Sequence, residues 1–320
     1  MNEISIGSPI LWGGFVAFVL VMLALDLFVF GANKAHKVGI KEAASWSFVW
    51  FALAIGFNAG LWWHMQGTLG SEIADRKALE FLTGYLIEKS LSVDNVFVFL
   101  LIFTAFQVPP EYQRRVLIYG VLGAIVLRII MIMLGSWIVQ EFKWVLYLFG
   151  FFLLLTGIKM MIPSDEKPEM EKNWVVKLAR KYLRITPDFR GEKFMVRNNG
   201  IRYFTPLFLV LILIEVTDVI FAVDSIPAIF AITTDPFIVA TSNIFAIMGL
   251  RALYFLLADM AERFHLIKYG LAIVLAFIGT KMLLMPWFHM PVAISLAVVV
   301  SVIALSVMAS LWVTRKKPVG

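Results

Sequence analysis

Long hydrophobic runs separated by short polar segments dominate the chain. Runs of roughly 20 apolar residues, the length an α-helix needs to cross the core of a bilayer, occur nine times. They cover residues 9–31, 43–64, 79–106, 116–138, 144–162, 204–232, 238–258, 268–286 and 291–314. No Lys or Arg precedes the first run, so it lacks the basic segment of a cleavable signal peptide and is expected to be retained. The pattern predicts an all-α, polytopic membrane protein of about nine transmembrane helices, with residues 1–320 as a single transmembrane domain.

Composition narrows the chemistry that such a protein can perform. The chain is 61% hydrophobic and 16% charged, and it contains no Cys and 4 His. A disulfide scaffold is excluded, and a metal cage of thiolates or imidazoles is hard to build, so any metal chemistry would use oxygen ligands. No His-Glu-x-x-His, Walker or Gly-x-Ser-x-Gly motif occurs, and we expect neither an enzyme nor a bound cofactor.

The basic residues in the connections indicate the orientation. One alternating set of connections holds twenty Lys and Arg, and the other holds only Arg76, Lys77 and Lys143. The positive-inside rule then places the N-terminus outside and the C-terminus in the cytoplasm. The net charge of +6 sits mostly in these connections, where we expect it to face anionic lipid headgroups rather than nucleic acid.

The longest connection, residues 163–202, contains ten basic and six acidic residues. Trp174, Val175, Leu178 and Tyr182 share one helical face, whereas Lys177, Arg180, Lys181 and Arg184 share another. This pattern predicts a short helix at the membrane surface. A regulatory or partner-docking role for the connection is the alternative.

Three successive runs of the first half recur in the second half. Glu88 to Asn95 matches Asp218 to Ser225, with an acid, four residues, Val-Asp and then Asn or Ser. Gly123 to Arg128 likewise matches Ala246 to Arg251, and Gly157 to Met160 matches Gly279 to Met282. Three crossings separate the copies, so the second enters the membrane from the opposite face, as in many secondary transporters. We therefore expect an inverted repeat, with repeat A over 79–162 and repeat B over 204–286, flanked by helices 9–31, 43–64 and 291–314.

Six acids lie well inside the apolar runs, where each ionised side chain costs about 2.5–3.5 kcal/mol at a helix centre. They must be protonated, paired with a base or holding a cation; the six are Asp26, Glu88, Asp94, Glu215, Asp218 and Asp224. Five bases lie in the same runs, but Lys159 and Lys281 are near helix ends and can reach the headgroups. We expect Arg128 and Arg251 to pair with some acids and the remaining acids to form a cation site.

On a straight helix Asp218 and Asp224 point apart, since six residues rotate by 600°. A break near Pro227, or at the Asp-Asn and Asp-Ser steps, would bring such groups together at the midplane. The expected ligands are carboxylates, Asn95, Ser225 and backbone oxygens, which suit Mn²⁺, Mg²⁺ or Ca²⁺. Asp26 either lines the same cavity or makes a structural hydrogen bond.

The segments EKSLSVDNVFVF (Glu88 to Phe99) and EVTDVIFAVDSIPAIFAI (Glu215 to Ile232) closely resemble the TerC family of tellurium-resistance-associated membrane proteins. The likeness extends from Gly13 through the last apolar run and is closest to the bacterial Alx-like branch. Members of that branch are associated with manganese export and alkaline-pH responses, and the family falls within the LysE-type transporter superfamily. The resemblance implies Mn²⁺ efflux across the bacterial inner membrane. It implies as metal site the polar positions Glu88, Asp94, Asn95, Glu215, Asp218, Asp224 and Ser225.

These observations lead to the hypothesis of a secondary transporter that exports Mn²⁺ by alternating access, driven by proton exchange or by the membrane potential. One alternative is a non-transporting membrane factor that assists insertion or assembly of other proteins. Another is an intramembrane hydrolase with Asp94 and Asp224 as an aspartyl dyad, which requires the two carboxylates within hydrogen-bonding reach. The oligomeric state, the coupling ion and any handling of tellurite stay open.

Overall fold

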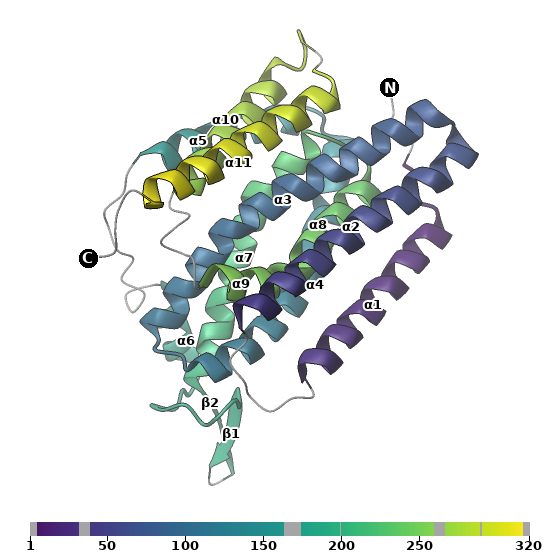
Figure 1. Cartoon of the computed structure of the whole chain (residues 1–320). Coiled ribbons are helices and arrows are strands. Elements are labelled where there is room, and N and C mark those ends of the chain that lie inside the picture. The colour runs from purple at the N-terminus through teal and green to yellow at the C-terminus, as the bar shows by residue number, and fades with distance from the viewer. Residues whose placement is uncertain are drawn as a thin grey trace.

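A computed structural model describes residues 5–31, 39–162, 174–198, 200–258, 266–288 and 290–315. Eleven helices and one short hairpin account for most of them (Figure 1). The helices are α1 (Pro9–Gly31), α2 (Ile40–Leu69), α3 (Ser71–Ala105), α4 (Pro110–Glu141), α5 (Val145–Met161), α6 (Trp174–Tyr182), α7 (Pro206–Phe230), α8 (Pro236–Met248), α9 (Leu250–Ala258), α10 (Ile267–Leu284) and α11 (Val292–Arg315). The strands are β1 (Met195–Asn198) and β2 (Ile201–Phe204).

The helices confirm an all-α, multi-pass membrane protein. Six segments are long and apolar enough to cross a bilayer, namely α2, α4, α7, α8 with α9, α10 and α11. Two shorter apolar helices lie at Pro9–Leu25 and Val145–Met161. Every one of the nine apolar runs falls on a helix, with run 238–258 divided between α8 and α9.

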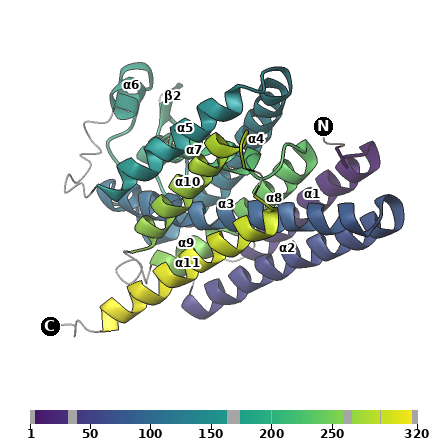
Figure 2. The ribbon, with the colours of Figure 1, turned by 90° about the horizontal axis from the view of Figure 1, so that it is seen from above.

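α3 and α7, which contain five of the six intramembrane acids, lie at the centre of the bundle. α3 packs along α7 and α8, and α4 packs along the same two helices. α5 and α10 form the closest helix pair and lie beside this centre, and α11 covers α10 and α3 (Figure 2). α2 packs on α3 and α9, and α1 lies at the edge of the bundle (Figure 1).

The bundle has two ends, which we name by landmark residues. At the hairpin end, α3, α5 and α9 finish, α4, α7 and α10 begin, and β1 and β2 project (Figure 1). At the Gly70 end, α2 turns into α3, and α8 and α11 begin. Gly70 has φ of +89°, a value that glycine adopts without steric cost, so the chain reverses between two long helices there.

α5 and α10 cross at two glycines that occupy equivalent repeat positions. A Cβ on Gly157 would lie 2.7 Å from both the carbonyl oxygen of Ala272 and the nitrogen of Ala276. A Cβ on Gly279 would lie 2.6 Å from the corresponding atoms of Gly150 and Leu154. The register that matches Gly157 with Gly279 also matches Gly150 with Ala272 and Leu154 with Ala276. The two helices therefore meet symmetrically, backbone to backbone.

The expected helix break lies in another helix. α3 and α7 run without interruption through Asp94 and Asp224, so the prediction of a break near Pro227 or at the Asp-Asn and Asp-Ser steps is wrong. Pro227 lies in the last turn of α7, and the helix ends three residues after it, at Phe230. The discontinuity is instead at Gly249, between α8 and α9. There the Lys89 ammonium donates to the carbonyl of Ala246 at 3.2 Å, in space that a Gly249 side chain would occupy.

The described part of the 163–202 connection, residues 174–198 and 200–202, folds onto the hairpin end. α6 confirms the predicted short helix, but its apolar residues divide: Val175 is buried against α7, whereas Trp174, Leu178 and Tyr182 are exposed. The antiparallel hairpin, with Met195 opposite Phe204, was not predicted from the sequence. Its strands contain only four residues each, too few to show an alternating pattern.

Candidate functional site: an acidic cavity among α3, α5, α7 and α10

The predicted polar residues gather around one cavity in the centre of the bundle. The cavity has a volume of about 450 Å³ and is lined by α3, α4, α5, α7 and α10. Five of the seven predicted site residues line it, namely Glu88, Asp94, Asn95, Asp224 and Ser225. Lys159, Met160 and Ile162 from the end of α5 and Lys268 from the start of α10 complete its wall toward the hairpin end.

Arg128 neutralises part of this acidic set. Its side chain is completely buried, and it donates to the carboxylate of Glu88 and, at 3.2 and 3.4 Å, to both oxygens of Asp218. It also donates to Ser225 at 3.2 Å and to the side-chain oxygen of Asn243 at 3.1 Å. This arrangement provides the ion pair expected for Arg128. One guanidinium thus holds two carboxylates from α3 and α7.

Asp94 and Asp224 have different surroundings. The Thr156 hydroxyl donates to Asp224, and Lys159 lies close to the same carboxylate. Lys268 is the positive charge near Asp94. Both lysines are exposed at the wall toward the hairpin end. We expected Lys159 to extend to the headgroups, but it lines the cavity opposite an acid.

Asn95 lines this cavity and has a buried side-chain oxygen without a partner in the described part of the chain. The residue is 1% exposed, and its side-chain oxygen has no hydrogen-bond partner among the described residues. A buried carbonyl without a donor costs about 1–3 kcal/mol, so protein interiors normally provide one. An unpaired amide oxygen beside two carboxylates is the arrangement that a hard cation would satisfy.

The other predicted residues are placed elsewhere. Asp218 faces Arg128 rather than the cavity, and Glu215 lies one turn away, where its carboxylate occupies the space beside Gly123 of α4. Arg251 is buried in α9 and does not line the cavity. The side chain of Asp26 lies outside the described residues, as do His36, Arg263 and His265.

The carboxylates are not assembled into a compact cage. Within the described ranges, no three His, Asp or Glu side chains come close enough together to hold a metal ion by themselves. The cavity instead offers two carboxylates, the Asn95 oxygen and the hydroxyls of Thr156 and Ser225. Such a set can bind a hydrated divalent cation weakly, which suits passage better than retention.

A second acidic cluster was missed by the sequence reasoning. Lys77, Glu80 and Asp235 are each 1% exposed and lie together at the Gly70 end. They stand at or outside the ends of the apolar runs 79–106 and 238–258, where charged residues are usually solvated. The Lys77 to Glu80 spacing of three residues was the available signal, since it allows an ion pair on one helix face.

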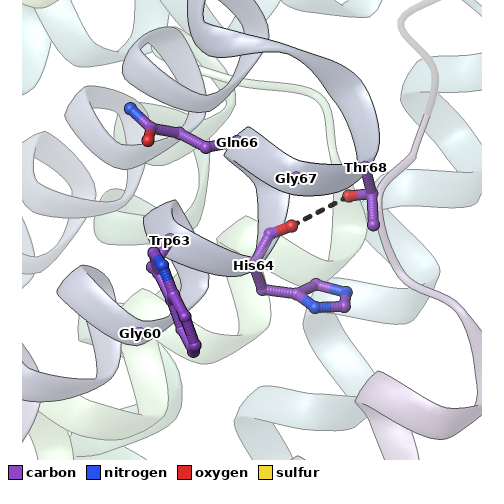
Figure 3. A pocket seen from close by; sticks show the side chains of 6 residues that line it. All are labelled: Gly60, Trp63, His64, Gln66, Gly67 and Thr68. Carbon is purple, nitrogen blue, oxygen red and sulfur yellow. Dashed lines mark hydrogen bonds between the residues drawn. The ribbon is translucent and has the colours of Figure 1, made fainter.

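An open hollow on the surface of α2 contains no acid. It has a volume of about 860 Å³ and is lined by Gly60, Trp63, His64, Gln66, Gly67 and Thr68 (Figure 3). The Thr68 hydroxyl donates to the carbonyl of His64 at 3.0 Å, so part of its polar surface is satisfied within the helix (Figure 3). No carboxylate lines this hollow, so it lacks the ligands that a hard cation prefers.

Comparison with known proteins agrees with the resemblance in the motifs. Residues 73–318 match the family described as "Integral membrane protein TerC family". The chain is 55% identical over 313 residues to "Putative membrane-bound redox modulator Alx" of Salmonella typhi, and the alignment covers 98% of this chain and 97% of the relative. It is 56% identical over 312 residues to the protein of that name in Escherichia coli (strain K12), covering 98% and 97% of the two chains. A membrane protein of Myxococcus xanthus is 49% identical over 314 residues, with 98% and 96% covered. No solved structure matches. The chain belongs to the TerC family of integral membrane proteins.

Proposed function

We propose that this protein is a secondary transporter that exports a divalent cation, with Mn²⁺ as the substrate. One observation carries the proposal: the cavity brings the unpaired, buried oxygen of Asn95 together with the carboxylates of Asp94 and Asp224. Arg128 pairs with Glu88 and Asp218, whereas the bases near Asp94 and Asp224 are the exposed Lys268 and Lys159, which a mobile cation can replace. The all-oxygen donor set favours Mn²⁺, Mg²⁺ or Ca²⁺, and the choice of Mn²⁺ comes from the family resemblance.

The proposed architecture has nine membrane crossings, built on an inverted repeat. α3, α4 and α5 form one unit, and α7, α8 with α9, and α10 form the other. The symmetric crossing of α5 and α10 at Gly157 and Gly279 supports this arrangement, since a twofold axis must map each contact onto the other. α3 against α8 and α4 against α7 are likewise equivalent pairs.

In the proposed orientation the N-terminus is outside and the hairpin end faces the cytoplasm. The basic residues of α6 and of the hairpin then face the anionic lipids of the inner leaflet. The cavity wall that carries Lys159 and Lys268 is on the cytoplasmic side. We propose that cations enter the cavity from this side.

Release requires the carboxylates to lose their affinity on the outer side. Protons and metal ions compete for the same oxygens, so protonation of Asp94 or Asp224 would free the cation there. Lys159 and Lys268 provide a further step, because each ammonium can pair with the carboxylate that the cation leaves. We propose that the two repeat units rock about the cavity during this cycle.

The names of the relatives point to redox modulation as a different activity. This chain has no Cys, so thiol and disulfide chemistry is not available to it. The cavity and its donors support transport of a cation more directly than electron transfer.

Replacing Asp94 or Asp224 by Asn in manganese-sensitive cells tests the proposal. We expect intracellular Mn to rise to the level of cells that lack the protein, with the variant present in the membrane at normal amount. Asp188→Asn, an exposed acid of the connection at the hairpin end, is the matched control and should leave Mn unchanged. Normal Mn levels in both cavity variants would favour the non-transporting membrane factor, which does not need these charges.

A further inference from the structure

A buried ion cluster lies at the Gly70 end of the bundle. The Lys77 ammonium donates to Glu80 at 2.8 Å and lies 3.5 Å from the carboxylate of Asp235. Arg76 approaches Glu80 from the surface at 3.6 Å, and Lys281 of α10 is close enough to interact with it electrostatically. The cluster thus joins α3 to the start of α8 through charges that water does not reach.

Asp235 extends the cluster to the N-terminal segment. Its carboxylate accepts from the Ser5 hydroxyl and from the backbone nitrogen of Ile6, both at 3.0 Å. It also accepts from the backbone nitrogen of Phe237 at 3.0 Å and so caps the N-terminus of α8. The Asp235 carboxylate therefore joins the start of α8 to the N-terminal segment and, through Lys77, to α3.

The cluster closes a seam that leads to the acidic cavity. Along the interface of α3 with α8, Asn243 donates to Glu88 at 3.2 Å at the cavity. One turn of α3 toward the Gly70 end, Gly84 packs directly on Ser242, and a Cβ at Gly84 would lie 3.4 Å from the Cβ of Ser242. Lys77, Glu80 and Asp235 follow beyond that contact, so the same two helices lie between the cavity and the Gly70 end.

The other repeat unit has no such charges at the matching positions. The register that matches Glu88 with Asp218 matches Lys77 with Leu207 and Glu80 with Val210, and both are buried apolar residues at the hairpin end. Helix packing at this position therefore works without charge. Burying an ion pair rarely improves stability over apolar side chains, so a role in specificity or switching is the better explanation for the charged version.

We propose that Lys77, Glu80 and Asp235 form the outer gate for the divalent cation, held closed in this structure by the Lys77 ammonium. The inference rests on the proposed transport function and names the residues that separate the cavity from the outside. Opening parts α3 from α8 along the Gly84 and Ser242 contact, and exposes two carboxylates to the departing cation. The carboxylates of Glu80 and Asp235 are suitable ligands for a divalent cation, and they can attract it once the Lys77 ammonium moves away.

A reversible cross-link tests the gate without changing any charge. The chain has no Cys, so Gly84→Cys with Ser242→Cys places the only two thiols on opposite sides of the seam, at a Cβ separation close to that of disulfides. We expect Mn²⁺ flux in proteoliposomes to stop when the pair is oxidised and to return on reduction, whereas each single cysteine variant transports in both conditions. Full flux through the oxidised pair would overturn the gate and leave the proposed transport standing.

Thiol labelling tests the gate independently of transport. In a Ser242→Cys protein, an impermeant maleimide added from the outside should react at least about tenfold faster when Glu80→Gln is present, since about 1.4 kcal/mol shifts a two-state equilibrium tenfold. Glu192→Gln, which breaks the exposed pair with Arg115 at the hairpin end, is the matched control and should not change the rate. Equal labelling in the Glu80→Gln and Glu192→Gln backgrounds would overturn the proposal, even if no cation is transported by any variant.

Discussion

Arg128 offers the sharpest test of how the buried charges are balanced. Arg128→Met removes the guanidinium and keeps most of the side-chain volume. Glu88 and Asp218, both buried on facing helices, then lose the base that bonds them. Ser225 and Asn243 lose a donor as well.

The expected cost follows from the asymmetry of buried ion pairs. Removing one partner of such a pair costs about 3–5 kcal/mol, because the remaining charge is left uncompensated. Replacing a whole buried ion triad by well-packed hydrophobic residues of similar volume is often neutral or stabilising by about 1–4 kcal/mol. The triple variant Arg128→Met, Glu88→Met and Asp218→Leu should therefore recover most of the stability that the single variant loses.

Thermal unfolding in detergent, followed by Trp fluorescence, measures both effects. With about 2–4 °C of Tm for each kcal/mol in chains of 150–250 residues, a loss of about 3–5 kcal/mol should lower the Tm of the single variant by roughly 6–20 °C relative to the parent protein. Glu192→Gln serves as control, since an exposed pair contributes about 1 kcal/mol or less. A single variant that melts within about 2 °C of the parent protein, or a triple variant that melts below the single one, would refute the balance described here.

Two further predictions separate packing from function. Gly157→Ala and Gly279→Ala should each lower the stability of the protein by about 1–3 kcal/mol, and by similar amounts, because each added methyl group meets equivalent backbone atoms. Gly56 on α2 has open space around it, so the control variant Gly56→Ala should not be destabilised. Unequal losses at the two crossing glycines, measured by thermal unfolding, would count against the twofold arrangement. Asn95→Leu should unfold at the same or a higher temperature, since it removes a buried oxygen that lacks a donor, and yet lose Mn²⁺ transport. A variant that keeps transport would show that this oxygen does not contact the cation.

The helices and most of the site could be predicted from the sequence because a bilayer imposes a simple length rule. Each apolar run needed only about 20 residues to be recognised, and matching acids in two runs indicated the cavity. The alternating basic connections gave an orientation, which stays a prediction. α6 followed from its amphipathic pattern.

Which acids pair with an arginine and which line the cavity could not be predicted from the sequence, because this depends on the direction of the Arg128 guanidinium. Arg128 and Arg251 occupy matching repeat positions, yet only Arg128 reaches Glu88 and Asp218 in the described structure. Gly249 interrupts the helix just before Arg251, and the space beside it is filled by the Lys89 ammonium and by Trp50. The break was expected at Pro227 because proline usually breaks or ends a helix, but α7 ends only three residues after Pro227, so the helix is continuous through Asp224.

The buried cluster of Lys77, Glu80 and Asp235 was overlooked for a related reason. Charged residues at the ends of apolar runs are normally in contact with water or headgroups. Burial here depends on the N-terminal segment, whose Ser5 and Ile6 fold over Asp235 from 230 residues away. Such long-range cover leaves no local pattern in the sequence.

Cation flux through the purified protein in liposomes tests the central claim most directly. Vesicles loaded with a manganese-sensitive dye and reconstituted with the parent protein should take up Mn²⁺ when a pH gradient or a membrane potential is imposed. Asp94→Asn and Asp224→Asn should reduce that uptake to the level of protein-free vesicles, while Asp188→Asn transports like the parent. Undiminished uptake in both cavity variants, or no uptake by a correctly folded parent protein under either gradient, would contradict the account.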